Sequence, residues 1–105
     1  MIKKKSLLLK RGLCNGIDSV CIVGPFDMID NQIDDIADAI FSEGKTDLVF
    51  DFKETDYLTS SGLAVLIKAL KKVQSVRGTL YIANITQDMH GLLSGSSLNT
   101  FVKYI

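Results

Sequence analysis

Residues 57–66 have the sequence YLTSSGLAVL, and in this stretch an extended run is expected to pass directly into a helix. Three hydroxyl residues, Thr59, Ser60 and Ser61, stand at the change. Such side chains cap helix N-termini, because an oxygen can accept from the unpaired N–H groups of the first turn. Gly62 has no Cβ, so another backbone or an anion can come close. A phosphate on one of these hydroxyls would face free amides and the positive end of the helix dipole, which predicts a switch.

Outward from this stretch, apolar spacing and turn signals predict alternating strands and helices. The expected elements are a β-hairpin over residues 6–14 and 17–23 around Asn15-Gly16, a helix over 28–42 closed by Gly44, a strand over 47–52, the helix of the quoted stretch ended by Gly78, a strand over 79–83, a helix over 86–93, a flexible connection over 94–97 and a strand over 101–105. This order predicts an α/β domain with a mixed, mostly parallel sheet and right-handed crossovers. One core is expected to contain Ile33, Ile40, Phe50, Phe52, Leu66, Leu70 and Ile82.

Composition limits the classes of function. The 105 residues are expected to form one domain, 1–105. Twelve basic and twelve acidic residues cancel, so no overall field favours nucleic acid or an anionic membrane. Lys10 and Arg11 interrupt the first apolar run, and nothing approaches the about 20 apolar residues of a membrane span. These features favour a protein partner and a cytoplasmic location.

The two cysteines are not expected to form a disulfide. If Asn15-Gly16 is a two-residue hairpin turn, Cys14 pairs with Ile17, whereas Cys21 lies opposite Lys10. Two free thiols agree with a reducing compartment.

Catalytic and metal sites are weakly supported. Asp30, Asp34, Asp35 and Asp38 share one helix face, but with no His or Cys nearby they indicate a surface facing water or a partner. With His90 as the single histidine, no triad of nucleophile, base and orienting group can be drawn. We therefore expect no enzyme activity, no metal and no cofactor.

A receiver-like phosphoaspartate protein is a rival hypothesis. Asp51 lies near a predicted strand end, as such a site requires. However, that site also needs an acidic pair after the first strand, and Asp27 stands there alone with Met28 next to it. An interaction module controlled by phosphorylation is therefore favoured.

Residues 48–52 (LVFDF), followed after six residues by 59–63 (TSSGL), resemble the STAS domain of anti-sigma-factor antagonists. The signature of that family is a strand, a short loop and Asp-Ser-Ser/Thr-Gly-Leu. Residues 24–27 (GPFD) resemble the family's Gly-x-hydrophobic-Asp at the end of an earlier strand, and the spacing through residues 98–101 also fits. The resemblance extends over nearly the whole chain.

The resemblance implies a partner-switching protein. The unphosphorylated antagonist binds an anti-sigma factor with serine kinase activity and so frees the sigma factor; phosphorylation breaks the complex, and a serine phosphatase restores it. The phosphorylated serine of the motif corresponds to Ser60. The surrounding switch surface is expected to comprise Asp27, Thr59, Ser61, Gly62 and Leu63. The resemblance is compatible with a monomer or a weak dimer.

The sequence departs from the family pattern at three places. Thr59 stands where the family has Asp, although Thr59 can still cap the helix. Ser97 stands where many members have Gly, and no C-terminal helix follows Ile105, so one flank of the sheet is expected to be bare or covered by a partner. The alternatives are therefore that Ser60 is only a cap, that Asp27 only opens the first helix, and that the chain is a STAS-type interaction scaffold not regulated by a kinase.

Overall fold

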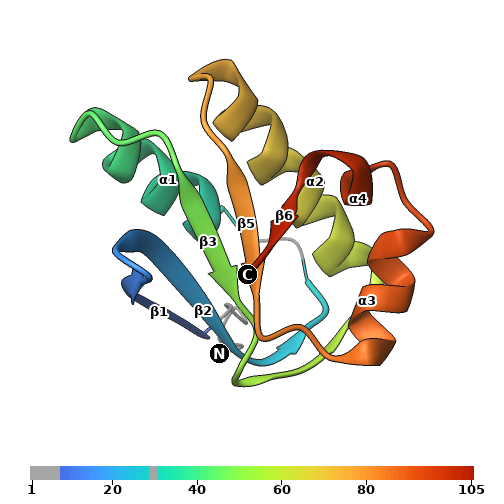
Figure 1. The fold of residues 1–105 in the computed structure, drawn as a ribbon. Coiled ribbons are helices and arrows are strands. Elements are labelled where there is room, and N and C mark those ends of the chain that lie inside the picture. Colours follow the sequence, from blue (N-terminus) through green and yellow to red (C-terminus); the bar gives the residue numbers. More distant parts are fainter. Residues whose placement is uncertain (1–7, 29–30) are drawn as a thin grey trace.

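The structure of the protein, a computed structural model, describes residues 8–28 and 31–105. In this part of the chain a six-stranded sheet is combined with four helices (Figure 1). The elements are β1 Leu8–Cys14, β2 Ile17–Phe26, α1 Gln32–Ser42, β3 Leu48–Asp51, β4 Thr55–Leu58, α2 Ser60–Ser75, β5 Leu80–Ala83, α3 Gln87–Ser94, α4 Leu98–Phe101 and β6 Lys103–Tyr104.

The sheet has the order β1-β2-β3-β5-β6, and β4 pairs with the end of β2. Only the β1–β2 pair is antiparallel, so the predicted mixed, mostly parallel α/β architecture is confirmed. All the parallel strands therefore end on one side of the molecule, the lower side in Figure 1. We call this side the C-terminal end of the sheet; α2 begins there.

The N-terminal hairpin has the predicted register. Asn15 and Gly16 adopt φ angles of 52° and 79°, as a type I′ turn requires. Cys14 pairs with Ile17 and Lys10 with Cys21. Both cysteines are free, as expected.

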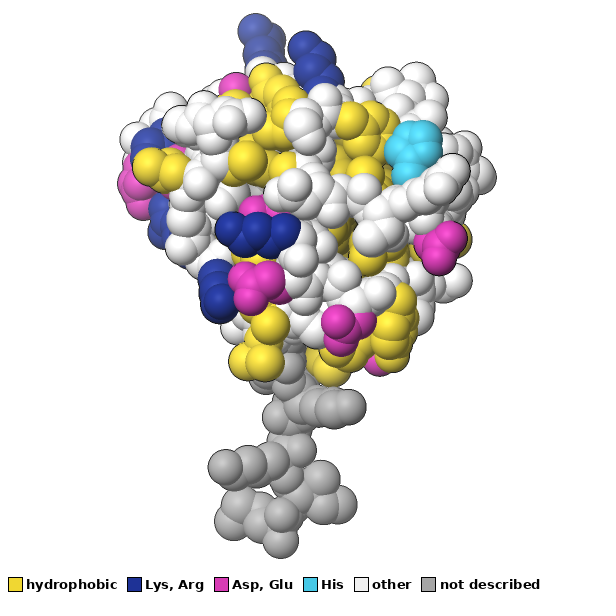
Figure 2. All heavy atoms as spheres, turned by 60° about the horizontal axis from the view of Figure 1, so that its bottom comes forward, with side chains coloured by type: hydrophobic (Ala, Val, Ile, Leu, Met, Phe, Trp, Pro, Cys, Tyr) yellow, Lys and Arg dark blue, Asp and Glu magenta, His cyan; other side chains and the backbone are white. Residues whose placement is uncertain are grey.

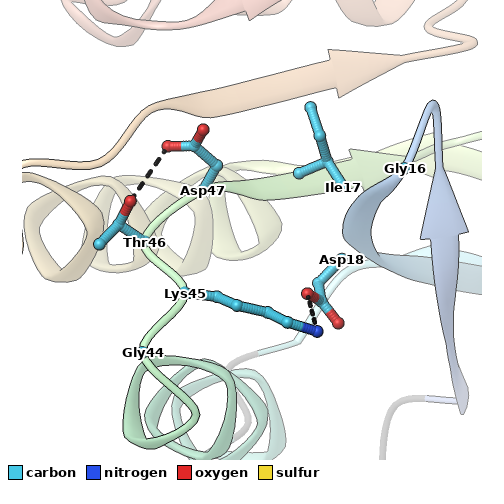
Figure 3. Close-up of a pocket in the computed structure, with 7 residues that line it drawn as sticks. All are labelled: Gly16, Ile17, Asp18, Gly44, Lys45, Thr46 and Asp47. Carbon is cyan, nitrogen blue, oxygen red and sulfur yellow. Dashed lines mark hydrogen bonds and ion pairs between the residues drawn. The ribbon is translucent and has the colours of Figure 1, made fainter.

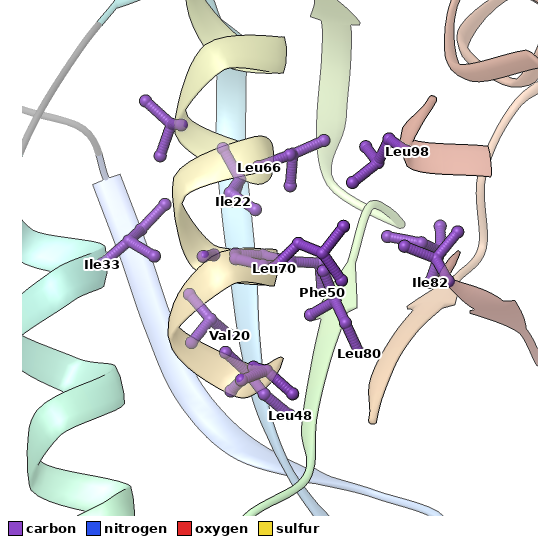
Figure 4. Packing of buried hydrophobic residues seen from close by; sticks show 14 of the residues in the cluster. Val20, Ile22, Ile33, Leu48, Phe50, Leu66, Leu70, Leu80, Ile82 and Leu98 are labelled. Carbon is purple, nitrogen blue, oxygen red and sulfur yellow. The ribbon is translucent and has the colours of Figure 1, made fainter. Parts of the chain in front are cut away.

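The core lies between the sheet and helices α1 and α2, which cover the same face (Figures 1 and 4). The register aligns Val20, Phe50 and Ile82 across three strands, so their side chains point to that face together. In Figure 4, Leu66 and Leu70 project from α2 toward these strands. Each of the seven residues predicted for the core belongs to one buried cluster: Ile33, Ile40, Phe50, Phe52, Leu66, Leu70 and Ile82.

The acidic face of α1 is partly used within the molecule. Asp34 and Asp38 form ion pairs with Lys68 and Lys72 of α2 at 2.6 and 2.8 Å, and Asp35 is exposed. The hydrogen bond to Asp38 raises the pKa of Lys72. Asp30 lies outside the described residues. Within residues 8–28 and 31–105, no group of His, Cys, Asp and Glu side chains could hold a metal ion.

Several boundaries differ from the prediction. Strand β2 continues to Phe26 rather than ending at residue 23. The first helix begins at Gln32 rather than at residue 28, where the chain bends. Residues 55–58 form the paired strand β4, whereas the sequence predicted only a short extended run before the helix; they pair with the end of the long strand β2. Residues 98–101 form a helical turn, so the last strand shrinks to Lys103–Tyr104.

The end of α2 also differs from the prediction. The left-handed residue that terminates the helix is Arg77, with φ 59°, and not Gly78. Gly78 is required for a different reason, since a Cβ there would overlap the backbone of Thr46. The glycine therefore allows a close approach of two segments rather than a left-handed turn.

Candidate functional site

The candidate site is the start of α2, at the C-terminal end of the sheet. Strand β4 leads into α2 through the single residue Thr59, whose backbone is extended with φ −111° and ψ 178°. Ser60 is the first helical residue and its side chain is exposed, whereas Ser61 is half-buried. Because the pairing of Leu58 with Phe26 fixes the end of β4, the sheet sets the position of Ser60.

The carbonyl oxygen of Phe26 holds this helix start. It accepts hydrogen bonds from the Thr59 backbone N–H at 3.1 Å and from the Thr59 hydroxyl at 3.4 Å. Thr59 occupies the N-cap position, but its side chain makes no capping hydrogen bond, so the predicted side-chain cap is wrong. The hydroxyl points to the carbonyl at the end of β2 instead.

As a result, the first turn of α2 receives no hydrogen bond from the side chain of its N-cap residue. An α-helix leaves its first N–H groups without intrahelical partners, and here the N-cap side chain does not supply an acceptor. The first turn also contains no acidic residue that would offset the positive end of the helix dipole. This arrangement suits an anion attached to Ser60.

Gly62 allows α2 to sit directly on the end of β2. A Cβ at this position would overlap the Phe26 carbonyl oxygen and lie 2.7 Å from Leu58 Cδ1 and 3.0 Å from the Phe26 ring. The predicted close approach of another backbone is therefore present, and that backbone is β2. The neighbouring Leu63 is partly buried and packs against the core.

Asp27 reaches the site through a residue that sequence analysis did not single out. The hydroxyl of Tyr57 donates a hydrogen bond to Asp27 Oδ2 at 3.2 Å, which joins the end of β2 to β4. This hydrogen bond raises the pKa of Tyr57. Asp27 follows β2 and Tyr57 lies in β4, and these strands are not consecutive in the sequence. Only the β2–β4 pairing, which was not predicted, could have indicated the contact.

Asp51, the residue of the rival phosphoaspartate hypothesis, makes hydrogen bonds that indicate a structural role. Its buried side chain accepts from the Asn84 amide at 2.9 Å and from the Lys53 backbone N–H at 3.0 Å. These bonds link the ends of β3 and β5.

His90 is exposed, and its ring lies 4.9 Å from the Tyr104 ring.

A cavity of about 310 Å³ lies at the opposite end of the sheet, between the hairpin turn and the segment before β3 (Figure 3). Lys45 reaches across it to Asp18, with Nζ and Oδ2 3.0 Å apart, and this hydrogen bond raises the pKa of Lys45. Arg11 pairs with the same buried carboxylate at 3.6 Å. These ion pairs connect the hairpin to the loop after α1, which indicates a structural role.

Comparison with known proteins places these features in a family context. A family model described as the STAS domain matches residues 18–104. Among curated proteins, no sequence matches significantly.

Solved structures show the same fold at low sequence identity. The anti-sigma factor antagonist SpoIIAA in its unphosphorylated form superimposes with a TM-score of 0.65 and 15% identity, covering 95% of this chain and 87% of that one. The phosphorylated form of SpoIIAA, a Bacillus cell fate determinant, gives 0.64 and 17% identity, with 95% and 91% coverage. An anti-sigma-factor antagonist domain protein from Planctomyces limnophilus gives 0.62 and 9% identity, with 91% and 88% coverage.

Proposed function

Because this chain belongs to the STAS domain family, we propose that it is a cytoplasmic anti-sigma factor antagonist whose binding is controlled by phosphorylation of Ser60. Unphosphorylated, it binds an anti-sigma factor with serine kinase activity and so frees the sigma factor. Phosphorylation ends the binding, and a serine phosphatase reverses it. The chain acts by binding rather than by catalysis.

The observation that carries this proposal is the placement of Ser60. Ser60 is exposed at the first position of a 16-residue helix whose N-cap side chain, that of Thr59, makes no capping hydrogen bond. A phosphate there can accept from the first-turn amides and faces the positive end of the helix dipole. The modified protein therefore keeps its fold, and the change is confined to the surface.

The same phosphate opposes a packed interface. It adds about −1.5 to −2 charges, and a partner that covers the start of α2 would have to desolvate them. Binding is thus switched off by local electrostatics and sterics.

The test uses the purified protein, a candidate anti-sigma factor kinase and ATP. We expect one phosphate, mapped to Ser60 by mass spectrometry, and loss of the complex in calorimetry. Ser60→Ala should bind the kinase without being modified, and Ser60→Asp should bind more weakly. Thr100→Ala, which removes an exposed hydroxyl from α4, is a matched control expected to behave as the unmodified sequence. Modification of Thr59 or Ser61 alone, or full affinity of Ser60→Asp, would contradict the proposal.

A second candidate is a STAS-type scaffold that uses this surface without a kinase. Thr59 favours it, because the residue before the serine has no carboxylate and uses its hydroxyl to bind the Phe26 carbonyl. A partner that binds the protein and its Ser60→Asp variant equally, with no transfer of phosphate, would identify this alternative.

A further inference from the structure

Ion pairing is unevenly distributed over the surface of this protein. Most carboxylates in the described part of the chain have a Lys or Arg partner; these are Asp18, Asp34, Asp38, Glu43, Asp51 and Glu54. By contrast, five described carboxylates form no ion pair with any described residue: Asp27, Asp35, Asp47, Asp56 and Asp88. Three of them, Asp27, Asp56 and Asp88, lie at the C-terminal end of the sheet. The lower right part of Figure 2 shows acidic side chains among hydrophobic ones, with no Lys or Arg beside them.

Two of these carboxylates border a groove that is lined by both polar and apolar side chains. The groove has a volume of about 220 Å³ and lies between β4 and the start of α3. Its lining residues are Asp56, Tyr57, Leu58, Thr86, Asp88 and Met89. Leu58 directly precedes Thr59, so the groove adjoins the start of α2.

The side chains of the groove match one kind of occupant. The partly buried Leu58 and the edge of the largely buried Met89 provide apolar contacts for an aliphatic stem, while Asp56 and Asp88 offer carboxylates that lack a counter-ion in the described structure. Tyr57 adds an aromatic ring that is 49% exposed, and the hydrogen bond to Asp27 restrains its position. A planar guanidinium on three methylenes can use all three features, because it stacks on aromatic rings and pairs with carboxylates through several N–H groups.

We propose that this groove receives an arginine side chain of the protein that binds the start of α2. The identity of that protein as an anti-sigma factor rests on the proposed function; the chemistry of the groove does not. The contact has a rigid receptor, since β4 is paired to β2 and α3 is capped by the Thr86 hydroxyl, which accepts from the Met89 N–H at 3.2 Å. Binding of the arginine therefore requires little conformational ordering of this protein.

The groove can be tested without the partner protein. We would titrate the ¹⁵N-labelled chain with N-acetyl-arginine methylamide and follow the backbone amide signals. The neutral citrulline analogue has nearly the same shape and is the ligand control. We expect saturable shifts confined to residues 56–58 and 86–89 with the arginine compound, and binding at least about tenfold weaker for citrulline, the ratio that the loss of one charge-assisted contact produces.

Two variants locate the charge. The double variant Asp56→Asn, Asp88→Asn should weaken arginine binding by about tenfold or more, because it removes both carboxylates with little change of volume. Glu43→Gln removes one exposed carboxylate at the opposite end of the sheet and should leave binding unchanged. Equal binding of arginine and citrulline, tighter binding of the lysine analogue, shifts outside the groove, or full binding by the double variant would each overturn the proposal.

These outcomes are separable from those of the proposed function. A chain that is phosphorylated at Ser60 but fails the arginine titration would retain the proposed function and lose this inference. A chain that binds arginine in the groove but is never phosphorylated would retain the inference and contradict the switch.

Discussion

Replacement of Gly62 by alanine tests the contact that positions the start of α2. Two effects oppose each other. Alanine is favoured over glycine by at most about 1 kcal/mol in a helix. Against this, the new Cβ would overlap the carbonyl oxygen of Phe26 and lie 2.7 Å from Leu58 Cδ1.

The overlap is expected to dominate. The Phe26 carbonyl is backbone and its ring is fully buried, so neither can move aside without shifting β2 or the helix. Overpacking of this kind costs about 1–3 kcal/mol, and sometimes more. We expect Gly62→Ala to lower the free energy of unfolding by about 1–3 kcal/mol, and Tm by about 4–8 °C for each kcal/mol in a domain of this size.

Urea and thermal unfolding followed by circular dichroism measure this change. Gly91→Ala is a matched control, because Gly91 lies within α3, its φ is not positive, and no neighbouring atom lies within 4 Å of the place that a Cβ would take. That variant should be more stable by up to about 1 kcal/mol, the helix preference alone. A Gly62→Ala protein as stable as the original sequence would refute the tight contact with Phe26.

Two further predictions follow from the cap geometry and from thiol burial. Thr86→Ala should lower the free energy of unfolding by about 0.5–2 kcal/mol, because the Thr86 hydroxyl accepts a hydrogen bond from the Met89 N–H. Thr59→Ala should lower it by less, because the Thr59 side chain caps no amide. Urea unfolding of the two variants measures both changes. Cys21 should react with iodoacetamide much more slowly than the less buried Cys14, since burial raises the pKa of the Cys21 thiol and restricts access. Mass spectrometry of Cys14→Ser and Cys21→Ser measures each thiol separately, and equal rates would contradict the buried position of Cys21.

The sequence predicted the fold correctly where residues close together in the chain determine the local structure. Asn15-Gly16 specified the hairpin register because a two-residue turn of this type allows one pairing. The apolar spacing of α2 identified Leu66 and Leu70 as core residues because one helix face must pack on the sheet. In both cases the deciding residues are neighbours in the chain.

Features that depend on distant segments were missed. Residues 55–58 include Asp56 and the half-exposed Tyr57, and they form a strand only because β2 extends to Phe26 beside them. The Thr59 hydroxyl was expected to serve its own helix, but a carbonyl 33 residues earlier in the chain lies within its reach. The sequence placed Ser60 at a helix start, and only the three-dimensional pairing shows what holds that start in position.

Side chains without an ion-pair partner give the two ends of α2 a local charge of opposite sign. Asp27, Asp56 and Asp88 lie on the side where α2 begins. Lys71 and Arg77, which form no ion pair with described residues, lie toward the other end, where the unpaired Asp47 accepts from the Thr79 N–H. The 16 residues of the helix span about 24 Å between these ends. Although the formal net charge of the full chain is zero, the three carboxylates favour encounters in which this end is oriented toward a basic surface. Encounters with such a surface should therefore become slower as added salt screens that orientation, even near the isoelectric point of about 6.5.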